Sequence, residues 1–212
     1  MKKSWIRNIL IAVLAVLLIY LGVRFISAGR ATSAKPVIYL YPEEETTVSV
    51  QLDVTGELTT TYPAYADGWT VTAEPDGTLH DAAGREYSYL FWEAEQAVDW
   101  DFSEGYCVRG ADTADFLREA LAARGLTPRE YNEFIVYWLP QMEGNAWNLI
   151  SFQTELYEEN AALTVTPAPD SVLRVFMSWK PVDEEIAIEP QAVEPFAREG
   201  FTLVEWGGVK VG

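Results

Sequence analysis

The sequence predicts an α+β domain, mainly antiparallel β-sheet with a two-helix insertion, that follows an N-terminal transmembrane helix. Three observations indicate this class. An uncharged apolar segment opens the chain, apolar and polar residues then alternate as they do in strands, and residues 112–139 have the periodicity and end signals of two helices. Strands that precede and follow a helical pair are typical of an antiparallel sheet covered by helices on one face or end.

The N-terminal segment has the composition of a membrane anchor. Ile9–Val23 holds no charge, and the apolar run extended to Ile26 is 18 residues long. At a rise of about 1.5 Å per residue it would form roughly 27 Å of helix, close to the hydrocarbon thickness of a bilayer. We therefore expect an anchor and a short linker in residues 1–34, with membrane contact through residues 9–26.

A cleaved signal peptide is the alternative for the same segment. Lys2, Lys3 and Arg7 would be its basic region, and Ser27-Ala28-Gly29 its cleavage site. The uncleaved anchor is favoured because the apolar run is at or beyond the upper limit for the core of a signal peptide. Either kind of segment exports the remainder of the chain.

The orientation of the anchor is predicted from the basic residues beside it. Those before the apolar run, together with the terminal amine, slightly outnumber those after it, which are Arg24, Arg30 and Lys35. Because cytoplasmic flanks carry the excess of Lys and Arg, we expect a single-pass protein of the cell membrane whose C-terminal domain is extracytoplasmic. A cytoplasmic domain with the opposite orientation stays open as an alternative.

The remainder of the chain is strongly acidic. Residues 31–212 hold ten basic and 32 acidic side chains, a net charge of −22. Such a domain repels phosphate backbones, which argues against nucleic acid as a partner and favours cationic partners, divalent metal or simple solubility. Cys107 is the only cysteine, so neither an intrachain disulfide nor a cysteine-rich zinc site can form. Because no cofactor-binding motif is present, we expect no cofactor and no resident metal.

Residues 35–212 are expected to form one domain that begins with a buried strand. Val37–Tyr41 is a continuous apolar run between two prolines, as in strands that are buried on both faces. Thr46–Val54 alternates as a half-buried strand does. Trp69–Glu95 has the alternation and turn residues of an antiparallel meander.

Two helices and four further strands complete the expected domain. Ala114–Arg124 has a single apolar stripe and is followed by Gly125, which favours a helix end. Thr127-Pro128-Arg129-Glu130 is a capping box, and the helix that it opens should run to about Trp138 and stop at Pro140. The strands that follow are Trp147–Thr154, Ala162–Val165, Leu173–Trp179 and Phe201–Trp206.

Tyr87–Glu95 is the stretch with the strongest candidate chemistry. Alternation places Glu93 in line with three aromatic residues, where burial would raise the pKa of its carboxyl and make it a general acid. Asp99 or Asp101 would supply a second carboxylate, and paired carboxylates beside aromatic rings are typical of glycan-cleaving sites. We favour the simpler interpretation, in which the aromatic side of the strand is core and its acidic end reaches solvent.

Three tryptophans are candidate ligand-binding residues, because their polar neighbours favour an exposed position and exposed rings stack on ligands. They are Trp69, Trp100 and Trp147. We therefore expect a binding or structural module of the cell envelope whose partner is a glycan or a protein. An envelope hydrolase of glycans that uses Glu93 with Asp99 or Asp101 is the alternative.

Several blocks of the domain resemble a family of uncharacterised bacterial membrane-anchored proteins. These blocks are KPVIYLYP, TYPAYADGWTV with PDGTL, YLFWE and the closing GFTLVEWGG. The resemblance covers most of residues 35–212, and the family shares these blocks behind an N-terminal hydrophobic segment. It implies a compact domain, and it implies no activity, substrate or catalytic residue.

Overall fold

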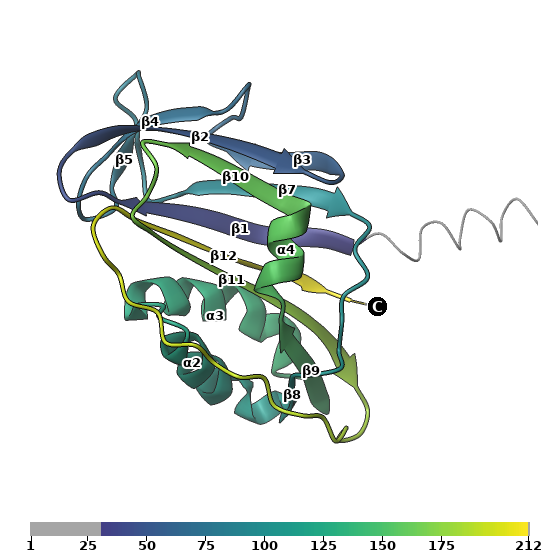
Figure 1. Ribbon diagram of the computed structural model, residues 1–212. Helices are drawn as coiled ribbons and strands as arrows, with labels where there is room; N and C mark the ends of the chain where they lie inside the picture. Colours follow the sequence, from purple (N-terminus) through teal and green to yellow (C-terminus); the bar gives the residue numbers. More distant parts are fainter. Residues whose placement is uncertain (1–30, 212) are drawn as a thin grey trace, which may run out of the picture.

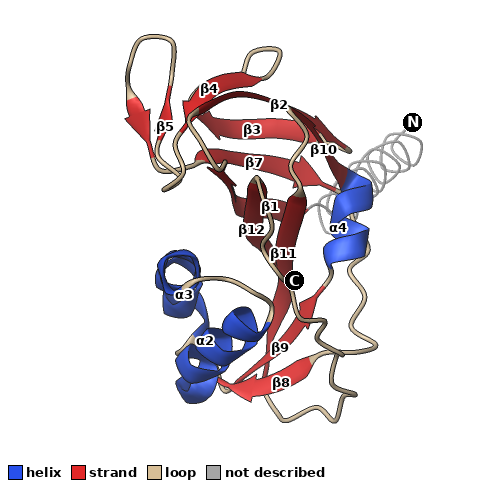
Figure 2. Ribbon diagram, turned by 60° about the vertical axis from the view of Figure 1, so that its left-hand side comes forward, coloured by secondary structure: helices blue, strands red, loops and turns tan. Residues whose placement is uncertain are grey.

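The computed structural model describes residues 31–211, which form three layers (Figures 1 and 2). A seven-stranded sheet is the middle layer. A five-stranded sheet covers one of its faces, and the helices α2 (Thr113–Ala123) and α3 (Pro128–Met142) cover the other. The chain is therefore a mixed α+β structure, mostly of antiparallel strands, as the sequence predicts.

The middle sheet contains, in spatial order, β3 (Glu57–Tyr62), β7 (Leu90–Gln96), β1 (Ala31–Tyr41), β12 (Thr202–Lys210), β11 (Ser171–Val182), β9 (Trp147–Phe152) and β8 (Tyr106–Arg109). The second sheet has the order β10 (Ala161–Thr166), β2 (Thr46–Val54), β4 (Trp69–Ala73), β5 (Leu79–His80) and β6 (Glu86–Tyr87). The 3₁₀ turn η1 (Gly110–Asp112) leads into α2, and the short helix α4 (Thr154–Asn160) joins β9 to β10. Neighbouring strands are antiparallel except for β11 and β12, which are parallel.

Strand β1 is buried on both faces, which confirms the prediction made from its continuous apolar run. Ile38 and Leu40 belong to the core between the two sheets, whereas Val37 and Tyr39 belong to the core beneath the helices. The strand begins at Ala31, so it is longer than its apolar part. Residues 31–33 have no strand-like alternation, and it is pairing with residues 94–96 of β7 that makes them a strand.

The helical pair forms where the sequence places it. The capping box is present, with the Thr127 and Glu130 side chains bonded to each other's backbone. The prediction that Pro140 ends the second helix is wrong, because α3 continues to Met142. Because proline has no backbone N–H, Pro140 cannot donate the helical hydrogen bond to the carbonyl of Val136. Val136 is 75% exposed, so water can reach this turn of the helix.

Three features of the chain order were not among the expectations. Residues 69–95 are divided between the sheets, since β4, β5 and β6 form a meander in the second sheet and β7 joins the first. Helix α4 begins at Thr154, a residue expected to end a strand, because seven residues are too few to show helical periodicity. Residues 183–200, here called the strap, connect the parallel strands β11 and β12 by a long crossover without a helix (Figure 1).

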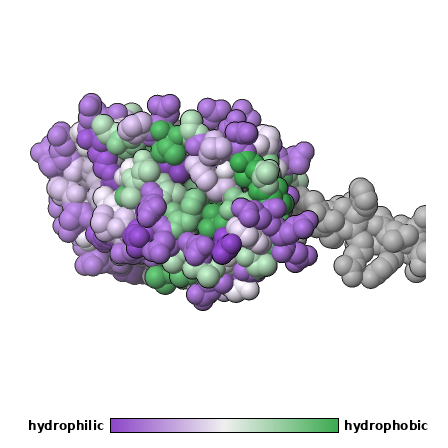
Figure 3. Space-filling view, turned by 90° about the horizontal axis from the view of Figure 1, so that it is seen from below, coloured by the Kyte–Doolittle hydropathy of each residue, from purple (hydrophilic) through white to green (hydrophobic). Residues whose placement is uncertain are grey.

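The predicted anchor lies in residues 1–30, outside the described part of the chain. Within residues 31–211, no helix is both long and apolar enough to cross a membrane. Strand β1 enters the sheet at the end of the domain where the C-terminus also lies (Figure 1). The face of the domain drawn in Figure 3 is mostly hydrophilic, with hydrophobic side chains gathered near its middle.

Candidate functional site

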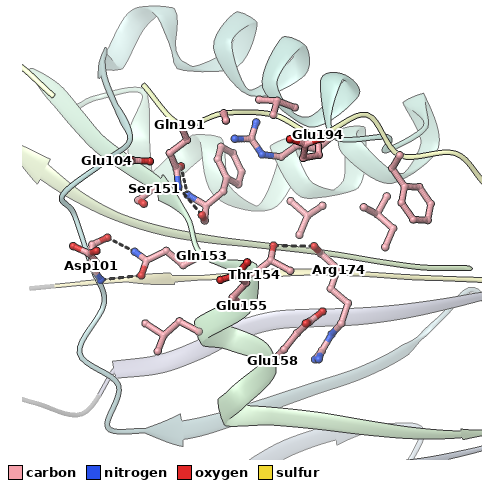
Figure 4. A pocket seen from close by; sticks show the side chains of 18 of the residues that line it. Asp101, Glu104, Ser151, Gln153, Thr154, Glu155, Glu158, Arg174, Gln191 and Glu194 are labelled. Carbon is pink, nitrogen blue, oxygen red and sulfur yellow. Dashed lines mark hydrogen bonds between the residues drawn. The ribbon is translucent and has the colours of Figure 1, made fainter. Parts of the chain in front are cut away.

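A groove of about 1020 Å³ runs beside the N-terminal half of β11, between α4 and the strap (Figure 4). It exists because β9 pairs with only part of its neighbour, from Met177 to Val182. The chain leaves the sheet after Phe152 and turns into α4, so the space that a longer β9 would fill is left open.

Helix α4 forms one wall and contacts the edge of β11 at two carbonyl groups. The backbone N–H of Gln153 donates to the carbonyl of Phe176 at 2.9 Å. The hydroxyl of Thr154 donates to the carbonyl of Arg174 at 3.0 Å. Beyond Arg174, toward Ser171, no described strand pairs with this edge.

The strap forms the opposite wall, held in place by its polar side chains. The side-chain amide of Gln191 accepts from the N–H of Phe152 at 2.7 Å and donates to its carbonyl at 2.8 Å. It thereby replaces the partner that a further strand would supply to β9. At the other end of the wall, the Arg198 guanidinium donates to the buried carboxylate of Glu130 and to the carbonyl of Gly125.

Asp101 and Gln153 meet at one end of the groove. The N–H of Asp101 donates to the amide oxygen of Gln153 at 2.8 Å, and the amide nitrogen of Gln153 donates to the carbonyl of Asp101 and, at 2.6 Å, to the hydroxyl of Ser178. Hydrogen bonds from the side chain and backbone of Ser103 hold the pKa of Asp101 below its usual value. Asp101 therefore carries its negative charge near neutral pH.

The lining of the groove is strongly negative. Six carboxylates line it against two guanidinium groups. The charge of Arg174 is balanced by Glu205, so only the Arg124 guanidinium, which lies over the ring of Phe152 at 3.8 Å, offsets these carboxylates. The carboxylates belong to Asp99, Asp101, Glu104, Glu155, Glu158 and Glu194. This arrangement attracts positively charged groups.

A buried ion pair underlies the α4 side of the groove. The Arg174 guanidinium donates to the Glu205 carboxylate at 2.5 Å and to the carbonyl of Ala161 at 2.7 Å, and the Trp92 indole donates to the second Glu205 oxygen at 3.0 Å. The guanidinium also lies 4.6 Å from the centre of the Tyr157 ring. These contacts join β7, β10, β11, β12 and α4, so the ion pair fixes the position of the α4 wall.

The three predicted catalytic residues do not come together. Asp99 and Asp101 both line the groove, but Glu93 does not. Glu93 lies near Tyr137 of α3. Burial of Tyr137 is the main cause of its raised pKa, and the negative charge of Glu93 is the second. Strand β7, which carries Glu93, is separated in the sheet from β11, which borders the groove, by β1 and β12.

The separation of these carboxylates has a simple structural cause. Strand β7 ends at Gln96, and the chain then passes around the end of the sheet. Trp100 belongs to the core between the sheets, on the face opposite the helices that Glu93 approaches. Although Glu93 and the two aspartates are close in sequence, they therefore lie on different sides of the middle sheet.

The expectation that the three candidate tryptophans are exposed is wrong for two of them. Trp69 is 3% exposed and Trp100 is 7% exposed, whereas Trp147 is half-buried beneath Arg109 at 5.1 Å. Trp69 shares the inner face of β4 with Val71 and Ala73, and its polar neighbour Thr70 points outward. None of the three lines the groove.

The residues that complete the groove were not predicted, because they come from separate segments of the chain. Gln153 and Glu155 follow β9, and Gln191 and Glu194 belong to the strap. No local pattern marks them, and only the edge of β11 brings them together.

Among residues 31–211, no group of three or more His, Cys, Asp or Glu side chains could hold a metal ion.

Comparison with known proteins relates the chain to an uncharacterised protein. No protein-family model matches the sequence, and no solved structure matches it. Over 71 residues the chain is 46% identical to an uncharacterised protein in the bglA 3′ region of Butyrivibrio fibrisolvens, a match that spans 32% of this chain and 73% of the relative. The chain belongs to the same family as this Butyrivibrio protein.

Proposed function

We propose that this protein is a binding module of the cell envelope, anchored in the cell membrane through residues 9–26, with its domain outside the cytoplasm. Its groove binds a positively charged segment of an envelope protein or glycan. One observation carries the proposal, namely the open edge of β11 between two walls that bear carboxylates. Cationic ligands fit this site because opposite charges steer association and select against anionic partners.

The arrangement of the carboxylates favours binding over hydrolysis. A glycan hydrolase needs a carboxyl group of raised pKa close to a second carboxylate. The pKa of Asp101 is lowered, and Glu93 lies outside the groove. The volume of the groove is at the upper end of the range for ligand sites, about 300–1,000 Å³, so it accommodates a segment of several residues.

Anchoring places the start of β1 close to the membrane. Residues 27–30 are the only ones between the predicted helix and β1, so they can hold Ala31 no farther than about 18 Å from the end of that helix. The sheet register sets Val172 beside Leu203 and Leu40, roughly 30 Å along β1 from Ala31, so the free edge of β11 lies toward the end of β1 that is away from the anchor. The charge balance around residues 9–26 supports the extracytoplasmic orientation of the domain.

A fluorescent, membrane-impermeant oligolysine added to oriented membrane vesicles that carry the full chain tests both parts of the proposal. We expect right-side-out vesicles to bind the probe and inside-out vesicles not to bind it. Neutralising three exposed groove carboxylates in Glu155→Gln, Glu158→Gln and Glu194→Gln together should weaken binding about tenfold, because each exposed ion pair contributes modestly.

A second triple variant with the same change in net charge is the control. Glu43→Gln, Glu44→Gln and Glu45→Gln alter exposed residues outside the groove and should change the affinity less than about twofold. Equal losses in the two triple variants would show that only total charge matters and would contradict the groove. Binding confined to inside-out vesicles would contradict the orientation.

A further inference from the structure

We infer that the ligand is a polypeptide in extended conformation, which adds its backbone as a strand to the free edge of β11 at Val172. The inference rests on the proposed function, because it concerns the same groove. It commits the ligand to a protein segment with Lys or Arg side chains. Its basis is the pair of backbone groups, the N–H and C=O of Val172, that face the groove and that a charged cavity alone would not have.

The backbone direction of β11 identifies the free edge. The N–H of Ser171 donates to the carbonyl of Phe201 at 3.2 Å, so this residue faces β12. The carbonyls of Arg174 and Phe176 face the other way, toward α4. Because alternate residues of a strand direct their N–H and C=O groups to the same side, the N–H and C=O of Val172 point into the groove.

This edge has few of the protections that proteins give to exposed strands. Edges are usually covered, charged or interrupted by proline. Ser171, Val172 and Leu173 carry no charge, Val172 is 45% exposed, and no described strand pairs with them on the groove side. An added strand here would follow β11 from Ser171 to Arg174, about 13 Å, because the carbonyls of Arg174 and Phe176 are already bonded at the α4 wall, and this length suits a paired segment of about four residues.

The charges on the two walls select the side chains of the ligand. Glu155 and Glu158 project from α4, and Glu194 lies on the strap. Successive side chains of a strand point to opposite faces, so Lys or Arg residues at neighbouring positions would reach different walls. Val172 and Val193, both exposed, leave room for apolar side chains as well.

A glycan fits this groove less well than a polypeptide does. Sugars lack the alternating N–H and C=O groups that pair with a strand edge. The tryptophans expected to stack on sugars are not in the groove, and one of its two phenylalanine rings, that of Phe152, is covered by Arg124. The geometry therefore favours backbone pairing over ring stacking.

Proline at position 172 tests the inference in the purified full chain. Val172→Pro removes the N–H that faces the groove and leaves the β12 ladder intact, because that ladder uses the alternate residues. We expect it to weaken binding of a labelled peptide of alternating Lys and Val about tenfold, through the loss of that hydrogen bond. Val172→Thr keeps the N–H and the β-branched shape, so it should bind as the wild type does.

Changes in the probe give a second test that does not depend on the folding of a variant. The same peptide N-methylated at every residue cannot donate from either edge and should bind about tenfold more weakly than the unmodified peptide. Spermine and an oligomer of glucosamine carry positive charge without a peptide backbone, and their binding should not respond to Val172→Pro. Equal binding of methylated and unmodified peptides would overturn strand addition.

Failure of the inference and failure of the proposed function give different results. Strand addition alone fails if binding of spermine and the glucosamine oligomer is weakened by neutralising Glu155, Glu158 and Glu194, while N-methylation of the peptide does not weaken its binding. The proposed function fails, and the inference with it, if none of these cationic probes depends on the three carboxylates.

Discussion

Arg174→Met should lower the free energy of unfolding by about 3–5 kcal/mol, because it removes one partner of a buried ion pair. Glu205 is 0% exposed, and its carboxylate would keep only the hydrogen bond from Trp92. The carbonyl of Ala161 would lose its donor as well. Urea unfolding of the full chain at neutral pH measures the effect.

The double variant Arg174→Met, Glu205→Gln separates the cost of an unpaired charge from the loss of packing. The glutamine oxygen can still accept from the Trp92 indole, and no charge is left in the core. We therefore expect the double variant to be more stable than Arg174→Met alone. A double variant that is equally or less stable would show that the unpaired carboxylate is not the source of the loss.

Glu130→Gln should lower the free energy of unfolding by about 2 kcal/mol at neutral pH, because hydrogen bonds to a charged group are lost. Burial by itself would raise the pKa of Glu130, but hydrogen bonds from the Arg198 guanidinium and the Thr127 backbone outweigh it and lower the pKa. Arg198 donates to the two carboxylate oxygens at 3.0 Å and 2.6 Å, and Thr127 donates at 2.7 Å.

The loss in Glu130→Gln should depend on pH in one direction. A carboxyl whose pKa is lower in the folded state stabilises the fold above its unfolded pKa of about 4.3, and this stabilisation disappears as pH falls through the folded value. The difference between wild type and variant should therefore be full at neutral pH and smaller at about pH 3. Urea unfolding at both values measures it, and a difference that grows on acidification would contradict this account.

The same variant connects stability to the groove. Arg198 joins the strap to α3 through Glu130, and the strap carries Gln191 and Glu194 of the groove wall. Weakening this contact should raise the exchange rate of strap amides before the domain unfolds as a whole, because local opening needs less free energy than global unfolding.

The local features of the fold were predictable, since each depends on nearby residues. The capping box at Thr127 and Glu130 satisfies the first turn of α3, and the apolar run Val37–Tyr41 can be satisfied only by burial on both faces. The parallel pairing of β11 with β12 was not predictable in this way. It joins residues some 30 positions apart through a strap that has no regular pattern of its own.

The candidate site shows the same division between local and long-range information. Asp99 and Asp101 were singled out for their charge, and they do line the groove. Gln191 was not, because its role arises only from the unpaired N–H and C=O of Phe152 on a different strand. Glu93 was misplaced because a turn at the end of β7 sends its sequence neighbours to the other side of the sheet.

Hydrogen exchange of the full chain, with and without a saturating oligolysine, tests the central claim most directly, because it locates the bound ligand. The account predicts slower exchange in three separate segments, namely residues 153–158 of the α4 wall, residues 171–174 of β11 and residues 191–196 of the strap. The outer strands of the second sheet should be unchanged. Protection confined to other acidic surfaces, such as residues 43–45, would contradict binding in the groove.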